Sequence, residues 1–287
     1  MKLINPYYKI IKQEPGLSGI YKAIEQAGRT CYKSEDKITA ESAKDFVNRM
    51  IKSGHNAMLE FGTIYLKCPI AVYGIEGEDR SETNNPLEWF LYNPYSTGEE
   101  VWNKKAPYDE GYCYITTNYR VLIENNRLED LKYLCEPTEH HEKRICVKFI
   151  TDRGISHELV RHRVFSFAQE STRYCNYSKD KFDNELTFIV PSWVNEDDKP
   201  TSYDFMNSLK QCECGYLNML SGGYTPQQAR QVLPNALKTE INMCGFTSDW
   251  NHFFNLRDNP HAHPDMQALT KPLHKEIRDE RVLNAEG

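Results

Sequence analysis

The sequence predicts an α+β fold in a single domain over residues 1–287, with an inserted segment at about residues 70–145. Helical and strand-like patterns both occur before and after this segment. The segment itself is rich in turn signals and in tyrosine. A chain of 287 residues with 39% hydrophobic and 12% aromatic residues is also large enough for a packed core and a deep binding site.

One helix and one strand are predicted before the segment. Thr39 is a suitable N-cap for a helix that Gly54 ends. The apolar residues of this helix recur every three or four positions, at Ala43, Phe46, Val47, Met50 and Ile51. The short β-prone stretch Thr63–Cys68 predicts a strand.

Further elements are predicted within and after the segment. Tyr114–Val121 is expected to be a strand and Leu128–Leu134 a short helix. After residue 145, alternating apolar residues predict a strand over 145–149, followed by a helix over Ile155–Arg163. Three more helices are predicted, one closed by Gly222-Gly223, one capped by Thr225-Pro226-Gln227-Gln228 and one that carries Trp250, Phe253 and Phe254. A last helix carries Met266, Leu269, Leu273 and Ile277.

Charge and composition limit the classes of function. With 35 Lys and Arg against 41 Asp and Glu, the net charge of −6 disfavours a general nucleic-acid-binding protein. No apolar run approaches the roughly 18 residues of a membrane span, and the amino-terminal residues lack an apolar signal core. The nine scattered cysteines do not indicate a disulfide framework. We therefore expect a cytoplasmic protein without nucleic-acid or membrane partners.

The chemistry-bearing residues are densest at residues 161–174. Three arginines, one histidine and three aliphatic hydroxyls occur there in an otherwise acidic chain. Guanidinium groups match phosphate oxygens in two-point geometry, and hydroxyls add further donors. On a continuous helix Arg161 and Arg163 would point about 200° apart, so they would serve two partners unless the helix has already ended. A solvated helix face is the alternative, which the neighbouring apolar residues disfavour.

This cluster carries a family resemblance. Arg161-His162-Arg163, followed after seven residues by Ser171, resembles the signature of flavin-dependent thymidylate synthases. The segment 55–60 resembles the family's amino-terminal, histidine-containing flavin segment, and 28–31 resembles the short segment before it. Arg230, in 230–234, and Arg257 resemble its carboxy-terminal arginine pair. The resemblance covers about residues 20–68 and 145–275.

The resemblance implies a central mixed sheet with helices and a specific reaction. The family converts dUMP to dTMP by reductive methylation, with 5,10-methylenetetrahydrofolate as the one-carbon donor. Reduced FAD donates the hydride, and NADPH reduces the flavin. A homotetramer with FAD between subunits is implied as well, and no metal is expected.

The resemblance also implies roles for individual residues. Arg257 is the catalytic residue, because a fixed guanidinium at the N3–O region of uracil raises the electron density at C5. The residues that bind dUMP are Glu158, Arg161, Gln169, Ser171, Thr172, Arg173, Arg230 and Arg257. The residues that bind FAD are Cys31, His55, Ala57, Glu60, Arg161, His162, Arg163, Gln169, Ser248 and His252. Ala57 and Ser248 stand where the family often has a hydroxyl and an arginine, respectively.

Several alternatives remain open at this point. Cys68 or Cys175 could be the nucleophile of the cysteine-dependent route to thymidylate, although both are better explained as core residues. Ser171 has no evident base nearby, and nucleotide binding is the favoured interpretation. Helical and turn patterns explain Cys212-x-Cys214 and His261-Ala262-His263 better than a metal does. A single-stranded nucleic-acid-binding module that uses Phe165, Phe167 and Tyr174 as stacking platforms is the competing function.

Overall fold

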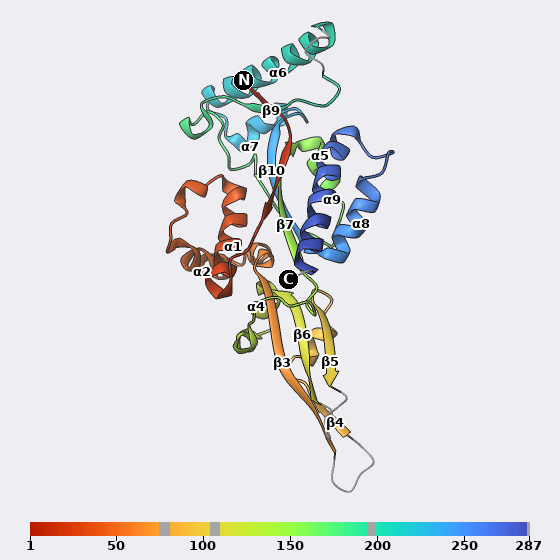
Figure 1. Cartoon of the computed structure of the whole chain (residues 1–287). Coiled ribbons are helices and arrows are strands. Elements are labelled where there is room, and N and C mark those ends of the chain that lie inside the picture. Colours follow the sequence, from red (N-terminus) through yellow and green to blue (C-terminus); the bar gives the residue numbers. More distant parts are fainter. Residues whose placement is uncertain (75–80, 104–109, 195–198, 286–287) are drawn as a thin grey trace. The chain divides into compact units, whose positions relative to one another are not determined.

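Helices and largely antiparallel strands follow one another irregularly along the chain, which confirms the α+β class (Figure 1). The computed structural model describes residues 1–74, 81–103, 110–194 and 199–285. The chain divides into two compact units. The first unit contains residues 1–11, 28–35 and 146–287, and the second contains 12–27 and 36–145.

The first unit is built on a four-stranded sheet with the order β2-β7-β10-β8. These strands are β2 (Tyr7–Ile11), β7 (Arg144–Asp152), β10 (Lys238–Phe246) and β8 (Ser166–Gln169). The pairs β2–β7 and β10–β8 are antiparallel, and Gln169 lies opposite Ile241. A second, parallel pair joins β1 (Lys2–Ile4) to β9 (Thr187–Ile189). The strand predicted at residues 145–149 is confirmed as part of β7.

The first unit also contains helices. They are α5 (Arg153–Leu159), α6 (Lys199–Ser221), α7 (Pro226–Ala229), α8 (Thr247–Arg257) and α9 (Pro264–Ala285), with short 3-10 turns at Asp180–Phe182 and Arg230–Val232. Helix α8 lies against β10 and α9 (Figure 1). Trp250 and Phe253 on α8 are fully buried, and Trp250 contacts the Phe165 ring edge-to-face at 4.9 Å between centroids. Aromatic packing therefore holds the end of α8, where Arg257 lies, in one position.

The predicted helix over 155–163 is four residues too long at its carboxy-terminal end. Helix α5 begins after Asp152, whose side chain accepts a hydrogen bond from Ile155 N at 2.9 Å, and it ends at Leu159. Arg161 and Arg163 consequently lie in the turn that follows the helix, and both are exposed. The predicted helix ends farther along are confirmed. Gly223 has a φ of 86°, which favours glycine, and Thr225 and Gln228 form a capping box.

The second unit contains an antiparallel sheet with the order β4-β3-β6-β5. These strands are β3 (Thr63–Gly74), β4 (Ser81–Asn84), β6 (Glu110–Asn118) and β5 (Thr97–Asn103). The helices are α1 (Gly16–Tyr32, whose last turn belongs to the first unit), α2 (Ser42–Ser53), α3 (Glu88–Leu91) and α4 (Tyr119–Glu124), with 3-10 segments at Glu35–Lys37, Asn56–Phe61 and Leu128–Tyr133. Leu59, Ile64 and Leu66 are fully buried in its core.

Two predicted boundaries in the second unit are wrong. The strand predicted to reach Val121 ends at Asn118, because the Asn118 side chain accepts a hydrogen bond from Val121 N at 3.2 Å and starts α4. Thr39 is not an N-cap. The Ser42 hydroxyl accepts a hydrogen bond from Thr39 N at 2.9 Å in a turn before α2, and the helix begins only at Ser42. The predicted stop at Gly54 is confirmed by its φ of 70°.

All nine cysteines lie in the described ranges, and none of them forms a disulfide there. No helix in the described part of the chain is long and apolar enough to cross a membrane.

Candidate active site

Arg257, the last residue of α8, is held by two residues from α5 and the turn after it. Its Nε donates a hydrogen bond to His162 Nε2 at 2.9 Å. Its Nη1 lies 2.5 Å from Glu158 Oε2, and its Nη2 donates to the Glu158 carbonyl at 3.1 Å. These contacts with described residues use three of the five N–H groups of the guanidinium, so two could serve a ligand.

His162 is neutral in this arrangement. It is 9% exposed, and its ring contacts the edge of Phe253 at 4.9 Å between centroids. Burial, followed by the nearby charges of Arg257 and His252, lowers the pKa of His162 to about 4. The unprotonated Nε2 can therefore accept the hydrogen bond from Arg257 at neutral pH.

Gln169, the last residue of β8, and the turn that follows it to residue 173 are fixed at several backbone and side-chain atoms. Gln169 Nε2 donates to the hydroxyls of Ser156 and Thr239 at 2.9 and 3.2 Å. Ser171 N donates to the Cys31 carbonyl at 3.0 Å, and Ser171 Oγ accepts from Arg173 N at 3.3 Å. The turn thus presents its side chains from a rigid backbone.

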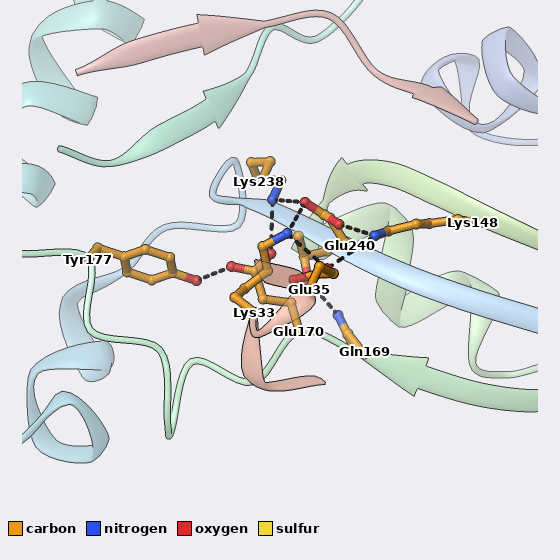
Figure 2. A network of polar contacts seen from close by, with 9 residues as sticks. Lys33, Glu35, Lys148, Gln169, Glu170, Tyr177, Lys238 and Glu240 are labelled. Atoms are coloured by element: carbon orange, nitrogen blue, oxygen red, sulfur yellow. Dashed lines mark hydrogen bonds and ion pairs between the residues drawn. The ribbon is translucent and has the colours of Figure 1, made fainter. Parts of the chain in front are cut away.

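A network of buried charges lies next to this turn (Figure 2). Glu240 on β10 is within 2.5–2.7 Å of the ammonium groups of Lys33, Lys148 and Lys238. Burial alone would raise the pKa of Glu240, but these ammonium groups outweigh it and hold the pKa well below the usual range. The carboxylate of the neighbouring Glu170 lies 3.0 Å from the ammonium group of Lys238. The backbone N of Glu170 donates a hydrogen bond to the Glu240 carbonyl at 2.8 Å.

Tyr177 completes the network by donating from its hydroxyl to Glu170 Oε1 at 2.9 Å. Burial and the Glu170 charge raise the pKa of Tyr177, so its hydroxyl keeps its proton. The sequence offered no signal for this network, because its lysines and glutamates are scattered over more than 200 positions. Its structural consequence is a fixed Glu170, directly before Ser171.

A pocket of about 310 Å³ opens in the first unit beside the turn. Thr172 and Arg230, both predicted to bind dUMP, line it together. Its other lining residues are Arg153, His157, Gln231, Leu233, Pro234 and Asn235. Arg153 and His157 are not among the predicted site residues. Their spacing of four on a helix, directly before Glu158, is the signal that could have identified them.

The remaining predicted dUMP residue of the turn is Arg173. It is exposed, and its Nε donates to Gln227 Oε1 at 2.8 Å. Gln227 belongs to α7, directly before the segment that carries Arg230. The structure therefore brings Arg173 close to the chain segment that lines the pocket.

The predicted flavin residues divide between the two units. In the first unit, Ser248 and His252 are exposed on α8, whereas Cys31 is half-buried beside Gln169. Burial raises the pKa of the Cys31 thiol to about 11, so the thiol stays protonated.

In the second unit, His55 and Ala57 are exposed, and Glu60 pairs with Arg120 at 2.6 Å. In the first unit, the exposed guanidinium groups of Arg161 and Arg163 flank the neutral imidazole of His162. Neither arginine has an ion-pair partner in the part of the chain that the structure describes, and cations of this kind suit an anionic dinucleotide. The donor set therefore fits FAD chemically.

The structure bears on the alternatives from the sequence. Cys68 and Cys175 are at most 1% exposed, unlike the accessible setting that an activated thiolate needs. Phe165 is buried against Trp250 and is no exposed stacking platform. Cys212 lies within α6, and His263 directly precedes α9. In the described ranges, no group of three or more His, Cys, Asp or Glu side chains is arranged to hold a metal ion.

The comparison with known families completes this description. The family described as thymidylate synthase complementing protein matches residues 113–280, which include the signature, Arg230 and Arg257. This chain belongs to that family. The match covers more than half of the chain and begins within the second unit, at β6.

This member of the thymidylate synthase complementing protein family resembles several proteins named flavin-dependent thymidylate synthase. It is 34% identical to one from Geobacter sulfurreducens over 117 residues, which are 41% of this chain and 48% of that protein. It is 32% identical to one from Corynebacterium efficiens over 145 residues, which are 46% of this chain and 55% of that protein. The alignments span about half the length of these relatives.

A solved structure also matches, that of a UMP/dUMP methylase PolB from Streptomyces cacaoi bound with 5-Br UMP. It shares 12% identity with a TM-score of 0.46, over 97% of this chain and 92% of that one.

Proposed function

We propose that this chain is a flavin-dependent thymidylate synthase. It methylates dUMP to dTMP, taking the one-carbon unit from 5,10-methylenetetrahydrofolate and the hydride from reduced FAD, which NADPH regenerates. The observation that carries the proposal is the guanidinium of Arg257, held at the end of α8 by Glu158 and by a neutral His162. Membership of the family and the names of the relatives support it.

In this proposal Arg257 activates the uracil ring. C5 of uracil is a weak nucleophile, and its electron density rises when negative charge on the N3–O region is stabilised. Two N–H groups of Arg257 have no acceptor among the described residues, and we propose that they face that region. The half-buried position strengthens the interaction, since Arg257 is 17% exposed and Glu158 27%. Glu158 also positions the guanidinium and is within reach of the uracil edge.

The nucleotide is held by the turn and the pocket beside it. Arg173, Arg230 and Arg161 bind the phosphate, while the hydroxyls of Ser171 and Thr172 orient it. Gln169 keeps the turn attached to β10 through Thr239. FAD, when bound, supplies the hydride chemistry.

The residues that we propose to hold the flavin are those that the family resemblance implies. They are Cys31, His55, Ala57, Glu60, Arg161, His162, Arg163, Gln169, Ser248 and His252. We further propose that residues 1–287 act as a single catalytic domain and that the protein is a cytoplasmic homotetramer with FAD between its subunits.

The test is a reconstituted reaction with the purified full chain. The protein should be yellow, with the visible absorption of an oxidised flavin, and should form dTMP from dUMP, 5,10-methylenetetrahydrofolate and NADPH. Omitting the folate or the reductant should each abolish dTMP formation. A colourless protein that binds no added FAD would contradict the proposal.

A further inference from the structure

Helix α9 holds the backbone at the end of α8, where Arg257 lies. The two helices lie side by side in the first unit (Figure 1). The hydroxyl of Thr270 on α9 donates a hydrogen bond to the Arg257 carbonyl at 2.9 Å, and Thr270 is fully buried. The last carbonyl groups of a helix have no donor within that helix. Thr270 therefore supplies a hydrogen bond that α8 itself cannot supply.

The residue after Arg257 is held from the same side of α9. Asp258 is the C-cap of α8, and its Oδ2 lies 2.8 Å from Nδ1 of His274. Because an ionised carboxylate only accepts, the His274 nitrogen is the donor. The His274 ring also stacks on Phe254, with 4.4 Å between the centroids and 9° between the planes. Thr270 and His274 are four residues apart, so one face of α9 carries both.

A carboxylate at the position of Asp258 needs such a partner. The carboxy-terminal end of a helix carries partial negative charge, which disfavours an acidic side chain there. Asp258 also follows Arg257 directly, and a carboxylate without a partner of its own would compete with Glu158 for the guanidinium. In the described part of the chain, Arg257 pairs with Glu158 and Asp258 pairs with His274. His274 thus keeps the two carboxylates on separate partners.

We infer that Thr270 and His274 are positioning residues, which act through the end of α8 to fix the Arg257 guanidinium where uracil is activated. The inference rests on the proposed function for the role of Arg257. Glu158 and His162 hold the side chain of Arg257, whereas α9 holds its backbone. Because a displacement of about 1 Å in a catalytic site can cost about 100-fold in rate, the backbone contacts matter as much as those of the side chain.

The first experiment removes the Thr270 hydroxyl and keeps the size of the side chain. Thr270→Val should lower kcat for dTMP formation roughly 10- to 100-fold, because the guanidinium is displaced from the reacting ring. The KM for dUMP should change less than about threefold, since the lost interaction acts on the transition state. Thr270→Ser keeps a hydroxyl and should recover most of kcat. Oxidation of NADPH without dUMP should persist in both variants.

Two variants separate the hydrogen bond of His274 from its stacking on Phe254. Asparagine has a donor near the position of Nδ1 but no ring, so His274→Asn should keep kcat close to that of the wild type. Phenylalanine keeps a ring but has no donor for Asp258. His274→Phe should therefore lower kcat, in the same direction as Thr270→Val.

The matched control is Ile277→Val, a truncation two turns farther along α9. Ile277 is buried, and this change destabilises a core about as much as the loss of one hydrogen bond does. Thermal melts verify that the variants are folded and similarly destabilised. The control should keep the wild-type kcat and KM, because it leaves the contacts with Arg257 and Asp258 in place.

The position of Arg257 also has a readout that needs no turnover. Burial, followed by the charges of Arg257 and His252, lowers the pKa of His162 to about 4. A displaced guanidinium should let this pKa rise towards the usual value of about 6.5. NMR titration of the flavin-free chain measures it, with the His162 signal identified by its loss in His162→Gln. The pKa should rise in Thr270→Val and stay unchanged in Ile277→Val.

The inference and the proposed function fail in different ways. If the wild type forms dTMP and Thr270→Val lowers kcat no more than Ile277→Val does, the inference is overturned. An unchanged His162 pKa in Thr270→Val would overturn it as well. If the wild type forms no dTMP but this pKa rises in Thr270→Val and not in the control, the positioning of Arg257 stands and the proposed function is wrong. Should Thr270→Val not fold, His274→Phe decides by the same measurements.

Discussion

The Nε of Arg257 donates to the Nε2 of His162 at 2.9 Å, which joins the end of α8 to the middle residue of the Arg161-His162-Arg163 motif. This contact requires an unprotonated imidazole nitrogen, and the burial of His162 provides it. A residue that the sequence groups with two exposed arginines therefore acts here as a neutral hydrogen-bond acceptor. Its partner is the arginine that we propose to activate the substrate.

Replacement of Arg257 by alanine should reduce dTMP formation at least 100-fold. Removing one fixed electrostatic donor typically lowers kcat by about 10²- to 10³-fold, and here the variant loses the group that polarises uracil. Flavin absorption and the unfolding midpoint should remain close to the wild-type values. Steady-state assays, visible spectra and thermal melts measure these quantities. Near-normal turnover in a folded Arg257→Ala protein would assign uracil activation to another residue.

His162 should make the unfolding free energy depend on pH. Burial and the Arg257 charge lower its pKa to about 4 in the folded protein, from about 6.5 when unfolded. The unfolded chain thus takes up a proton first, and stability is lost as the pH falls from about 6.5 towards 4. Between pH 7.5 and 4.5 this loss is about 2–3 kcal/mol.

The matched variant for this effect is His162→Gln, which keeps an acceptor for Arg257 but does not titrate. Denaturant unfolding of both flavin-free proteins at pH 7.5 and 4.5 isolates the contribution of His162. The wild type should lose more stability than the variant over this interval. Equal losses would mean that His162 titrates normally in the folded protein.

Replacement of Arg173 by alanine should separate nucleotide binding from flavin binding. An arginine–phosphate contact is charge-assisted, and its loss should weaken dUMP binding roughly 10- to 150-fold. FAD affinity should change much less, and oxidation of NADPH without dUMP should persist. Calorimetric titration of both ligands tests this. Similar losses for dUMP and FAD would indicate one shared pocket along the motif.

Glu240→Gln should destabilise the protein far more than Glu35→Gln does. Glu240 lies within 2.7 Å of three ammonium groups and its side chain is 11% exposed, so its neutralisation leaves buried cations poorly compensated. We expect a loss of about 3–5 kcal/mol. Glu35 contacts Lys33 and Lys148 at 3.2 and 3.4 Å and is 31% exposed, and its loss should be below about 1 kcal/mol. Urea unfolding curves measure both, and equal effects would refute a structural role for the network.

The predicted and observed helix ends show which features of the fold a single sequence can predict. The helix that ends at Gly54 and the capping box at Thr225 were predictable, because a left-handed glycine and a reciprocal cap depend on neighbours in the chain. The end of α5 at Leu159 was not predictable, and the predicted helix extended to Arg163. Its true end places Arg161 and Arg163 in a turn.

The candidate active site also has features that the sequence predicts and features that only the structure shows. The sequence by itself determined the signature from Arg161 to Ser171, the arginines at 230 and 257, and the family, because these are local residue types at recognisable spacing. Only the tertiary structure decided that His162 is a neutral acceptor for Arg257, that Glu240 joins three lysines, and that Arg153 shares a pocket with Arg230. Burial and contacts between distant residues arise from packing, and packing brings together side chains whose separation along the chain carries no pattern.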